Sequence, residues 1–193
     1  EPYRRQRQMC IRDRFIAGST WPPDEELLVG LIERYPDVKF IVAPHEIDPA
    51  RIEKFCERIS RPALRYTQLT PQSDLAAAGV LFVDTIGILS SVYRYGRWGY
   101  IGGGFGAGIH NTLEAATFGL PLAFGPRYGK FREARDLVTL RGAASIASAE
   151  ELERWFAGLH DDPDATGRSG TICKEYVLQH KGATARIMDE ICR

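Results

Sequence analysis

Short apolar segments alternate with stretches of helical periodicity along most of this chain. The segments 39–43 and 80–83 are apolar over nearly their whole length. Between them, as from 52 to 59, apolar residues recur every three or four positions, which is the period of an amphipathic helix. Apolar strands joined by helices are typical of a parallel sheet that helices cover on both faces. The sequence therefore predicts an α/β domain with a doubly wound parallel sheet.

The predicted elements follow each other in regular order. Strands are expected at 15–18, 39–43, 64–67, 80–83, 98–101 and 122–124. Helices are expected from Pro22 to Tyr35, from an Asp48 cap to Ile59, over 88–95 and over 110–118, and the part 149–192 is expected to be mainly helical. We exclude residues 1–14 from the fold as a non-native or linker segment, so the predicted domain is 15–193.

Composition excludes several classes of function. The chain has 193 residues, with 25 Lys and Arg against 25 Asp and Glu, so we expect no nucleic-acid partner. It has no apolar run of the roughly 20 residues that span a bilayer, and we expect it to be soluble. The four histidines have no partners at metal-ligand spacing, and no metal site is predicted.

Ligands of doubly wound folds bind at the carboxyl ends of the strands, and four loops there are unusual. Gly18–Pro22 offers small hydroxyl residues and N–H groups at a helix start, which suit an anion. The loop 43–46 brings a histidine and a glutamate to the end of a strand. Taken alone, the first loop is better explained as an ordinary helix cap, and the second is explained at least as well as a polar turn.

The third loop carries the strongest signal. Residues 102–108 contain five glycines, which let a backbone approach a ligand closely, and a helix follows directly. His110 and Glu114 lie one helical turn apart, on the same face. The loop thus combines an anion cradle with an imidazole and a carboxylate, and a flexible loop before a capped helix is the weaker interpretation.

The fourth loop, 125–134, places Arg127, Lys130 and Arg132 just beyond a strand, where they face either an anion or solvent. Three common nucleotide and hydrolase motifs are absent. The chain has no G-x-G-x-x-G fingerprint, no P-loop with its Ser or Thr, and no G-x-S-x-G elbow.

Taken in order, these segments resemble the donor half of 3-deoxy-D-manno-octulosonic acid (Kdo) transferases. The matching strings are G-S-T-W-P at 18–22, A-P-H-E at 43–46, D-T-I-G at 84–87, Y-R-Y-G at 93–96, G-G-G-F-G-A-G-I-H-N-T-L-E-A-A at 102–116, F-G-P-R-Y-G-K-F-R-E-A at 124–134 and G-A-T at 182–184. Any one string alone is weak, but the ordered set is specific.

The resemblance implies the C-terminal, Rossmann-like domain of a GT-B glycosyltransferase. It implies CMP-Kdo as donor, no metal cofactor, and inverting transfer of Kdo to a lipid A precursor in lipopolysaccharide synthesis. The full-length enzyme would act on the cytoplasmic face of the bacterial inner membrane. In the family the general base, the acceptor site and the membrane contact belong to an N-terminal domain that is absent here, so we expect donor binding without turnover and assign no catalytic residue.

The resemblance also implies roles for individual residues. Ser19 and Thr20 would lie by the donor phosphate, Pro44 and His45 by the cytosine, and Ile86, Gly87 and Ile88 in the nucleotide pocket. The remaining predicted donor contacts are Gly103, Gly104, Phe105, Gly106, His110, Asn111, Glu114, Lys130 and Glu133.

Three alternatives stay open at this point. They are a GT-B transferase that uses a UDP-sugar, an epimerase that acts on such a sugar, and a nucleotide-binding module without catalysis.

Overall fold

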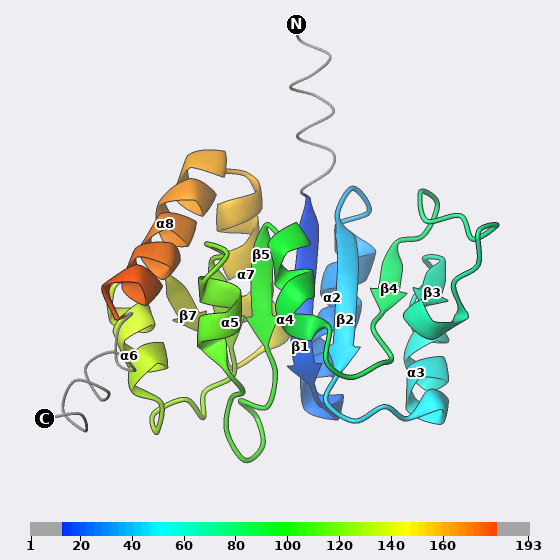
Figure 1. Ribbon diagram of the computed structural model, residues 1–193, viewed down its shortest axis with the longest axis horizontal. Coiled ribbons are helices and arrows are strands. Elements are labelled where there is room, and N and C mark those ends of the chain that lie inside the picture. The colour runs from blue at the N-terminus through cyan, green and yellow to red at the C-terminus, as the bar shows by residue number, and fades with distance from the viewer. Residues whose placement is uncertain (1–12, 181–193) are drawn as a thin grey trace, which may run out of the picture.

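In the computed structural model, which describes residues 13–180, all strands join one sheet and every pairing is parallel (Figure 1). The strands are β1 (Arg14–Thr20), β2 (Lys39–Pro44), β3 (Ala63–Arg65), β4 (Val80–Phe82), β5 (Trp98–Ile101), β6 (Leu122–Phe124) and β7 (Ala143–Ser145). Their order across the sheet is β3-β4-β2-β1-β5-β6-β7. The predicted parallel α/β class is confirmed.

The strand order reverses between β1 and β5. The chain first builds outward from β1 through β2 to β4 and β3, then returns to place β5 on the other side of β1. These two strands pair from Phe15 opposite Trp98 to Gly18 opposite Ile101. The loops that leave them in opposite directions open a crevice at their carboxyl ends, where doubly wound folds bind ligands.

Helices cover both faces of the sheet, and side chains of the strands alternate between two cores. Figure 1 shows α4 and α5 in front of the sheet and α2 behind it. The first core lies under α2 (Pro22–Arg34), α3 (Pro49–Cys56) and α7 (Ala149–His160). The second lies under α4 (Leu89–Val92), α5 (Thr112–Ala116), α6 (Arg132–Thr139) and α8 (Pro163–Gln179). On β1, Phe15 and Ala17 enter the first core and Ile16 enters the second.

Helix starts follow their sequence signals. Pro22 opens α2, and the Asp48 side chain accepts a hydrogen bond from Ala50 N at 2.9 Å to cap α3. Asn111 caps α5 in the same way, so that helix begins at Thr112, two residues after its predicted start. None of the described helices has the length and apolar character needed to cross a membrane.

Four details differ from the sequence prediction. The first strand begins at Arg14, within the segment 1–14 that was excluded from the fold. A seventh strand, Ala143–Ser145, was not predicted, because its small residues have little strand propensity. The expected helix over 88–95 divides into α4 and a 3₁₀ helix, Tyr93–Tyr95. The predicted strand 64–67 ends at Arg65, and a 3₁₀ helix, Tyr66–Gln68, follows. The G-A-T string at 182–184 and residues 1–12 lie outside the described residues.

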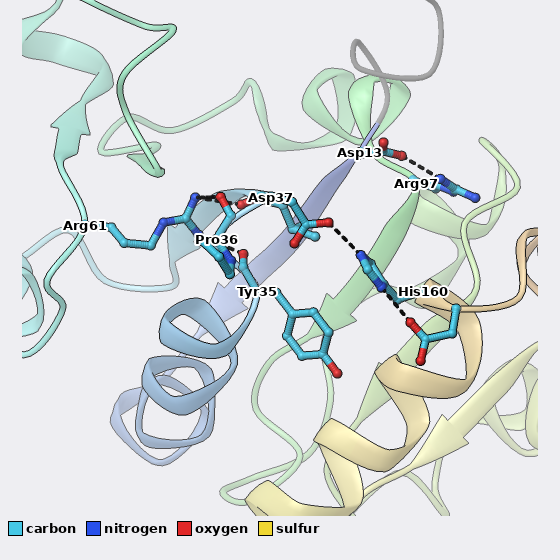
Figure 2. Close-up of polar contacts among 9 residues, drawn as sticks. Asp13, Tyr35, Pro36, Asp37, Arg61, Arg97 and His160 are labelled. Carbon is cyan, nitrogen blue, oxygen red and sulfur yellow. Dashed lines mark hydrogen bonds and ion pairs between the residues drawn. The ribbon is translucent and has the colours of Figure 1, made fainter. Parts of the chain in front are cut away.

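His160, at the end of α7, links that helix to the turn between α2 and β2 (Figure 2). Its Nε2 lies 3.0 Å from Asp37 Oδ2, and its Nδ1 lies 3.0 Å from Asp161 Oδ1. Burial disfavours the charged ring, but the hydrogen bonds to Asp161 and Asp37 outweigh it and raise the pKa of His160. When both ring nitrogens carry a proton, the imidazolium can donate to both carboxylates and so join α7 to the turn before β2.

Replacing His160 with Asn should destabilise the protein in a pH-dependent manner. Because the folded pKa is raised, the stabilisation is fully present below the unfolded value of about 6.5 and is lost as pH rises through the folded pKa. Denaturant unfolding of both proteins should show a difference of about 0.2–1 kcal/mol per ion pair in mildly acidic buffer and a smaller one at about pH 9. A difference that grows with pH would contradict this assignment.

Candidate functional site

Asp24, in the first turn of α2, is fully buried beneath the crevice. Its carboxylate accepts hydrogen bonds from Trp21 N at 2.9 Å, Gly103 N at 2.9 Å and Tyr100 Oη at 2.7 Å. Burial, together with the adjacent carboxylate, raises the pKa of Tyr100, so its hydroxyl remains a donor. One carboxylate thus ties the loop after β1 to the loop after β5.

Glu25, the next residue, links β1 to the loop after β2. Its Oε1 accepts a hydrogen bond from Thr20 Oγ1 at 3.1 Å and lies 3.5 Å from Arg51 Nη2. Arg51 in turn donates to Glu46 O at 3.0 Å, beside His45. Burial raises the pKa of Glu25, although Arg51 and Thr20 oppose this effect.

Asp84 supports the loop after β4. This buried carboxylate accepts hydrogen bonds from Arg65 Nε at 2.9 Å, Thr67 N at 2.9 Å and Thr67 Oγ1 at 2.6 Å. Burial alone would raise the pKa of Asp84, but the hydrogen bonds from Thr67 and Arg65 lower it. The ionised side chain therefore fixes the start of the D-T-I-G segment.

The glycine-rich loop after β5 is held by close backbone contacts. A Cβ on Gly102 would lie 2.2 Å from Ser19 O, and one on Gly104 would lie 2.5 Å from the Gly125 backbone. Gly103 has a φ of +93°, in the left-handed region. These glycines are required by packing within the protein. A Cβ on Gly106 would meet nothing nearer than 3.7 Å, so that glycine leaves space for another molecule.

Three rings meet above this loop. The His45 ring stacks on Trp21, with centroids 4.6 Å apart, and on His110, with centroids 4.3 Å apart. Trp21 Nε1 donates a hydrogen bond to His110 Nε2 at 3.2 Å. Side chains from the loops after β1, β2 and β5 are thereby joined in one cluster.

Two neighbouring cavities share His45. The smaller, about 160 Å³, is lined by Ser19, Pro44, Ile86 and Gly87 in addition to His45. The larger, about 510 Å³, is bordered by Trp21, Asp24, Gly103, Phe105, Gly106 and His110. Nine of the predicted donor contacts thus gather around one crevice. Among them, Ile86 is 87% exposed, which is unusual for a large apolar side chain.

The other predicted contacts have different surroundings. The Thr20 side chain is buried and turned toward Glu25. Ile88 is half-buried and packs on the second core. Asn111 Nδ2 donates to Glu114 Oε1 at 3.0 Å on the exposed side of α5.

The final three lie in or beyond the glycine loop. Gly104 is buried against Gly125 within it. Lys130 and Glu133 lie just before and at the start of α6, the former exposed and the latter half-buried.

Sequence reasoning did not assign Trp21 or Asp24 to the site. The burial of Asp24 depends on tertiary contact with β5 and the loop after it, which local sequence does not reveal. The signal that both carry is their position within four residues after the G-S-T string at 18–20.

A further cavity, of about 650 Å³, lies at the opposite end of the sheet. It is lined by the starts of β1 and β5 and by the turn between α7 and α8. Two of its charged groups, Arg97 and Asp13, pair with each other at 2.6 Å (Figure 2). Because it lies at the opposite end of the sheet, this cavity is separate from the crevice. Within residues 13–180, no three His, Cys, Asp or Glu side chains are placed to hold a metal ion.

Replacing Asp24 with Ala should destabilise the protein by about 3–5 kcal/mol, because three donors lose their acceptor beneath the crevice. Replacing the exposed Glu175 on α8 should change the free energy of unfolding by less than about 0.5 kcal/mol. Urea unfolding of both variants measures this contrast, and equal stabilities would show that Asp24 does not join the two loops.

Two glycine variants distinguish a packed position of the loop from an open one. Gly104→Ala should cost about 1–3 kcal/mol, because its Cβ meets the Gly125 backbone. Gly106→Ala should leave stability within about 0.5 kcal/mol of the parent protein. Thermal unfolding of the pair provides the measurement, and a greater loss for Gly106→Ala would contradict this account of the loop.

Comparison with known proteins identifies relatives for the whole described fold. A 3-deoxy-D-manno-octulosonic acid transferase of Rickettsia bellii is 31% identical over 182 residues, which are 91% of this chain and 42% of the relative. One from Aquifex aeolicus is 27% identical over 133 residues, 66% of this chain and 36% of the relative. The chain spans less than half the length of the curated relatives it matches. No protein-family model matches it.

Solved structures show the same fold. The C-terminal CMP-Kdo binding domain of WaaA from Acinetobacter baumannii superposes with a TM-score of 0.76 at 23% identity, over 91% of this chain and 94% of that one. The glycosyltransferase WaaG gives a TM-score of 0.61 at 14% identity, over 93% of this chain and 47% of that one. The chain is therefore similar to 3-deoxy-D-manno-octulosonic acid transferases over most of its length and has the fold of a GT-B C-terminal domain.

Proposed function

We propose that the crevice between the loops after β1 and β5 binds CMP-Kdo, the sugar donor of a Kdo transferase. The observation that carries this proposal is the pair of adjoining cavities at the point where the strand order reverses. The names of the relatives support the choice of donor, since they are Kdo transferases and one solved neighbour is a CMP-Kdo binding domain.

The two cavities suit the two ends of such a donor. The smaller offers apolar and ring surfaces, from Pro44, His45 and Ile86, to a cytosine base. The larger adjoins the glycine-rich loop, where a phosphate and a sugar carboxylate would lie. His45, which borders both cavities, would contact the donor near the bond between nucleotide and sugar.

The glycine-rich loop provides donors for the anionic groups. The N–H groups of Gly104 and Phe105 have no hydrogen-bond partner among the described residues. Arg127 lies next to them, and its Nη1 donates to Gly106 O at 2.7 Å. Backbone donors and a nearby cation can neutralise a phosphate without a metal ion, so we propose that donor binding is metal-independent.

We assign the transfer reaction to a protein of the relatives' length, and donor binding to these residues. In that enzyme the acceptor would be a lipid A precursor, and transfer would occur with inversion at the cytoplasmic face of the bacterial inner membrane. The general base would lie outside residues 13–180.

CMP affinity tests the proposal directly, with Glu114→Ala as the diagnostic variant. Loss of a carboxylate that binds a ribose hydroxyl should weaken CMP binding about 10–100-fold, measured by calorimetry or ligand-observed NMR. Stability should change little, because the Asn111 cap of α5 does not need Glu114. Glu175→Ala is the matched control.

Competition identifies the ligand class. CMP binding that UMP and NAD do not displace, and that EDTA leaves unchanged, supports the proposed donor. Preference for UMP would instead indicate a transferase or epimerase that uses a UDP-sugar. Unchanged CMP affinity in Glu114→Ala would remove this residue from the site.

A further inference from the structure

The contact between Trp21 and His110 determines where His110 carries its proton. An indole Nε1–H is a donor and never an acceptor. Since it lies 3.2 Å from His110 Nε2, that nitrogen must accept and therefore bears no proton. The ring is then neutral, and its one proton is on Nδ1.

The surroundings of His110 agree with a neutral ring. Its Cδ2 and Nε2 face Gly103, where a Cβ would lie 3.1 and 3.3 Å away, so Nδ1 lies on the opposite edge. The rings of His45 and Trp21 pack beside it. Burial and the neighbouring His45 lower the pKa of His110, and Asp24, which opposes them, already accepts three hydrogen bonds.

We propose that Trp21 is a positioning residue that holds His110 as a neutral donor, with Nδ1–H directed to an anionic oxygen of the ligand. The assignment of that oxygen to the donor phosphate rests on the proposed function. The tautomer itself depends only on the contact within the protein. His110 then acts as a directed hydrogen-bond donor and not as a cation or a proton acceptor.

The variant Trp21→Phe keeps an aromatic ring beside His45 but removes the indole donor. In the ¹⁵N-labelled parent protein, long-range ¹H–¹⁵N NMR spectra should show His110 with a protonated Nδ1 and a bare Nε2 at neutral pH. In Trp21→Phe both tautomers should be populated, and the measured pKa of His110 should rise because its neutral form has lost a hydrogen bond. Trp155→Phe, on α7 and away from the crevice, should leave the His110 spectrum unchanged.

A protonated Nε2 in the parent protein, or a His110 tautomer that Trp21→Phe leaves unchanged, would overturn the proposal. CMP affinity provides the second readout. It should fall about threefold to tenfold in Trp21→Phe, with no such fall in Trp155→Phe. Unchanged CMP affinity despite a changed tautomer would refute the directed contact with the ligand.

The two hypotheses fail in different ways. If the folded parent protein does not bind CMP, the proposed donor is wrong, and the tautomer measurement still decides the role of Trp21. If CMP binds but the His110 tautomer does not depend on Trp21, the donor stands and the positioning role is refuted. A circular dichroism spectrum and a melting curve for each variant confirm that it is folded.

Discussion

The buried Asp24 carboxylate is the interaction on which the crevice depends. It accepts from the loop after β1, three residues before it, and from a side chain of β5 and the glycine-rich loop, which lie 76 and 79 residues further along the chain. A buried carboxylate is costly unless its lone pairs are filled, and here each donor comes from an element that must be placed correctly. The site is therefore assembled only when the two halves of the sheet have joined.

Two further carboxylates act in the same way at the neighbouring loops. Glu25 is connected through Arg51 to the backbone beside His45, and Asp84 fixes the segment that precedes Ile86. Each loop that borders the cavities is thus anchored by an ionisable group below it, while the surfaces that face the cavities are mostly rings, glycines and exposed apolar side chains. Ionisable side chains thus lie beneath the loops, and few charged side chains line the cavities. An anionic sugar nucleotide would accordingly be contacted mainly by hydrogen-bond donors and less by charged side chains.

The parallel sheet and the positions of the loops could be predicted from the sequence, because both follow from local periodicity and from the rule that ligands bind at the carboxyl ends of strands. The different roles of the glycines within the glycine-rich loop could not be predicted from the sequence. Gly104 and Gly106 look alike in sequence, yet one is packed against Gly125 and the other has open space around it. Asp24 and Glu25 are similarly indistinguishable from solvated helix-start residues, since their burial arises from strands that are distant in the chain. β7 was missed because three small residues form a strand only when β6 is beside them.

The ring cluster explains how a loop-built site can still be rigid. Loops that follow parallel strands are joined by few backbone hydrogen bonds, such as the one from His45 N to Thr20 O at 2.9 Å, so side chains contribute to setting their relative positions. Trp21, His45 and His110 come from three such loops and contact each other through stacking and one hydrogen bond. A ligand that spans both cavities passes His45, and any displacement of that ring would disturb its two neighbours. The two cavities therefore share one ring, and the same aromatic contacts fix its position relative to both.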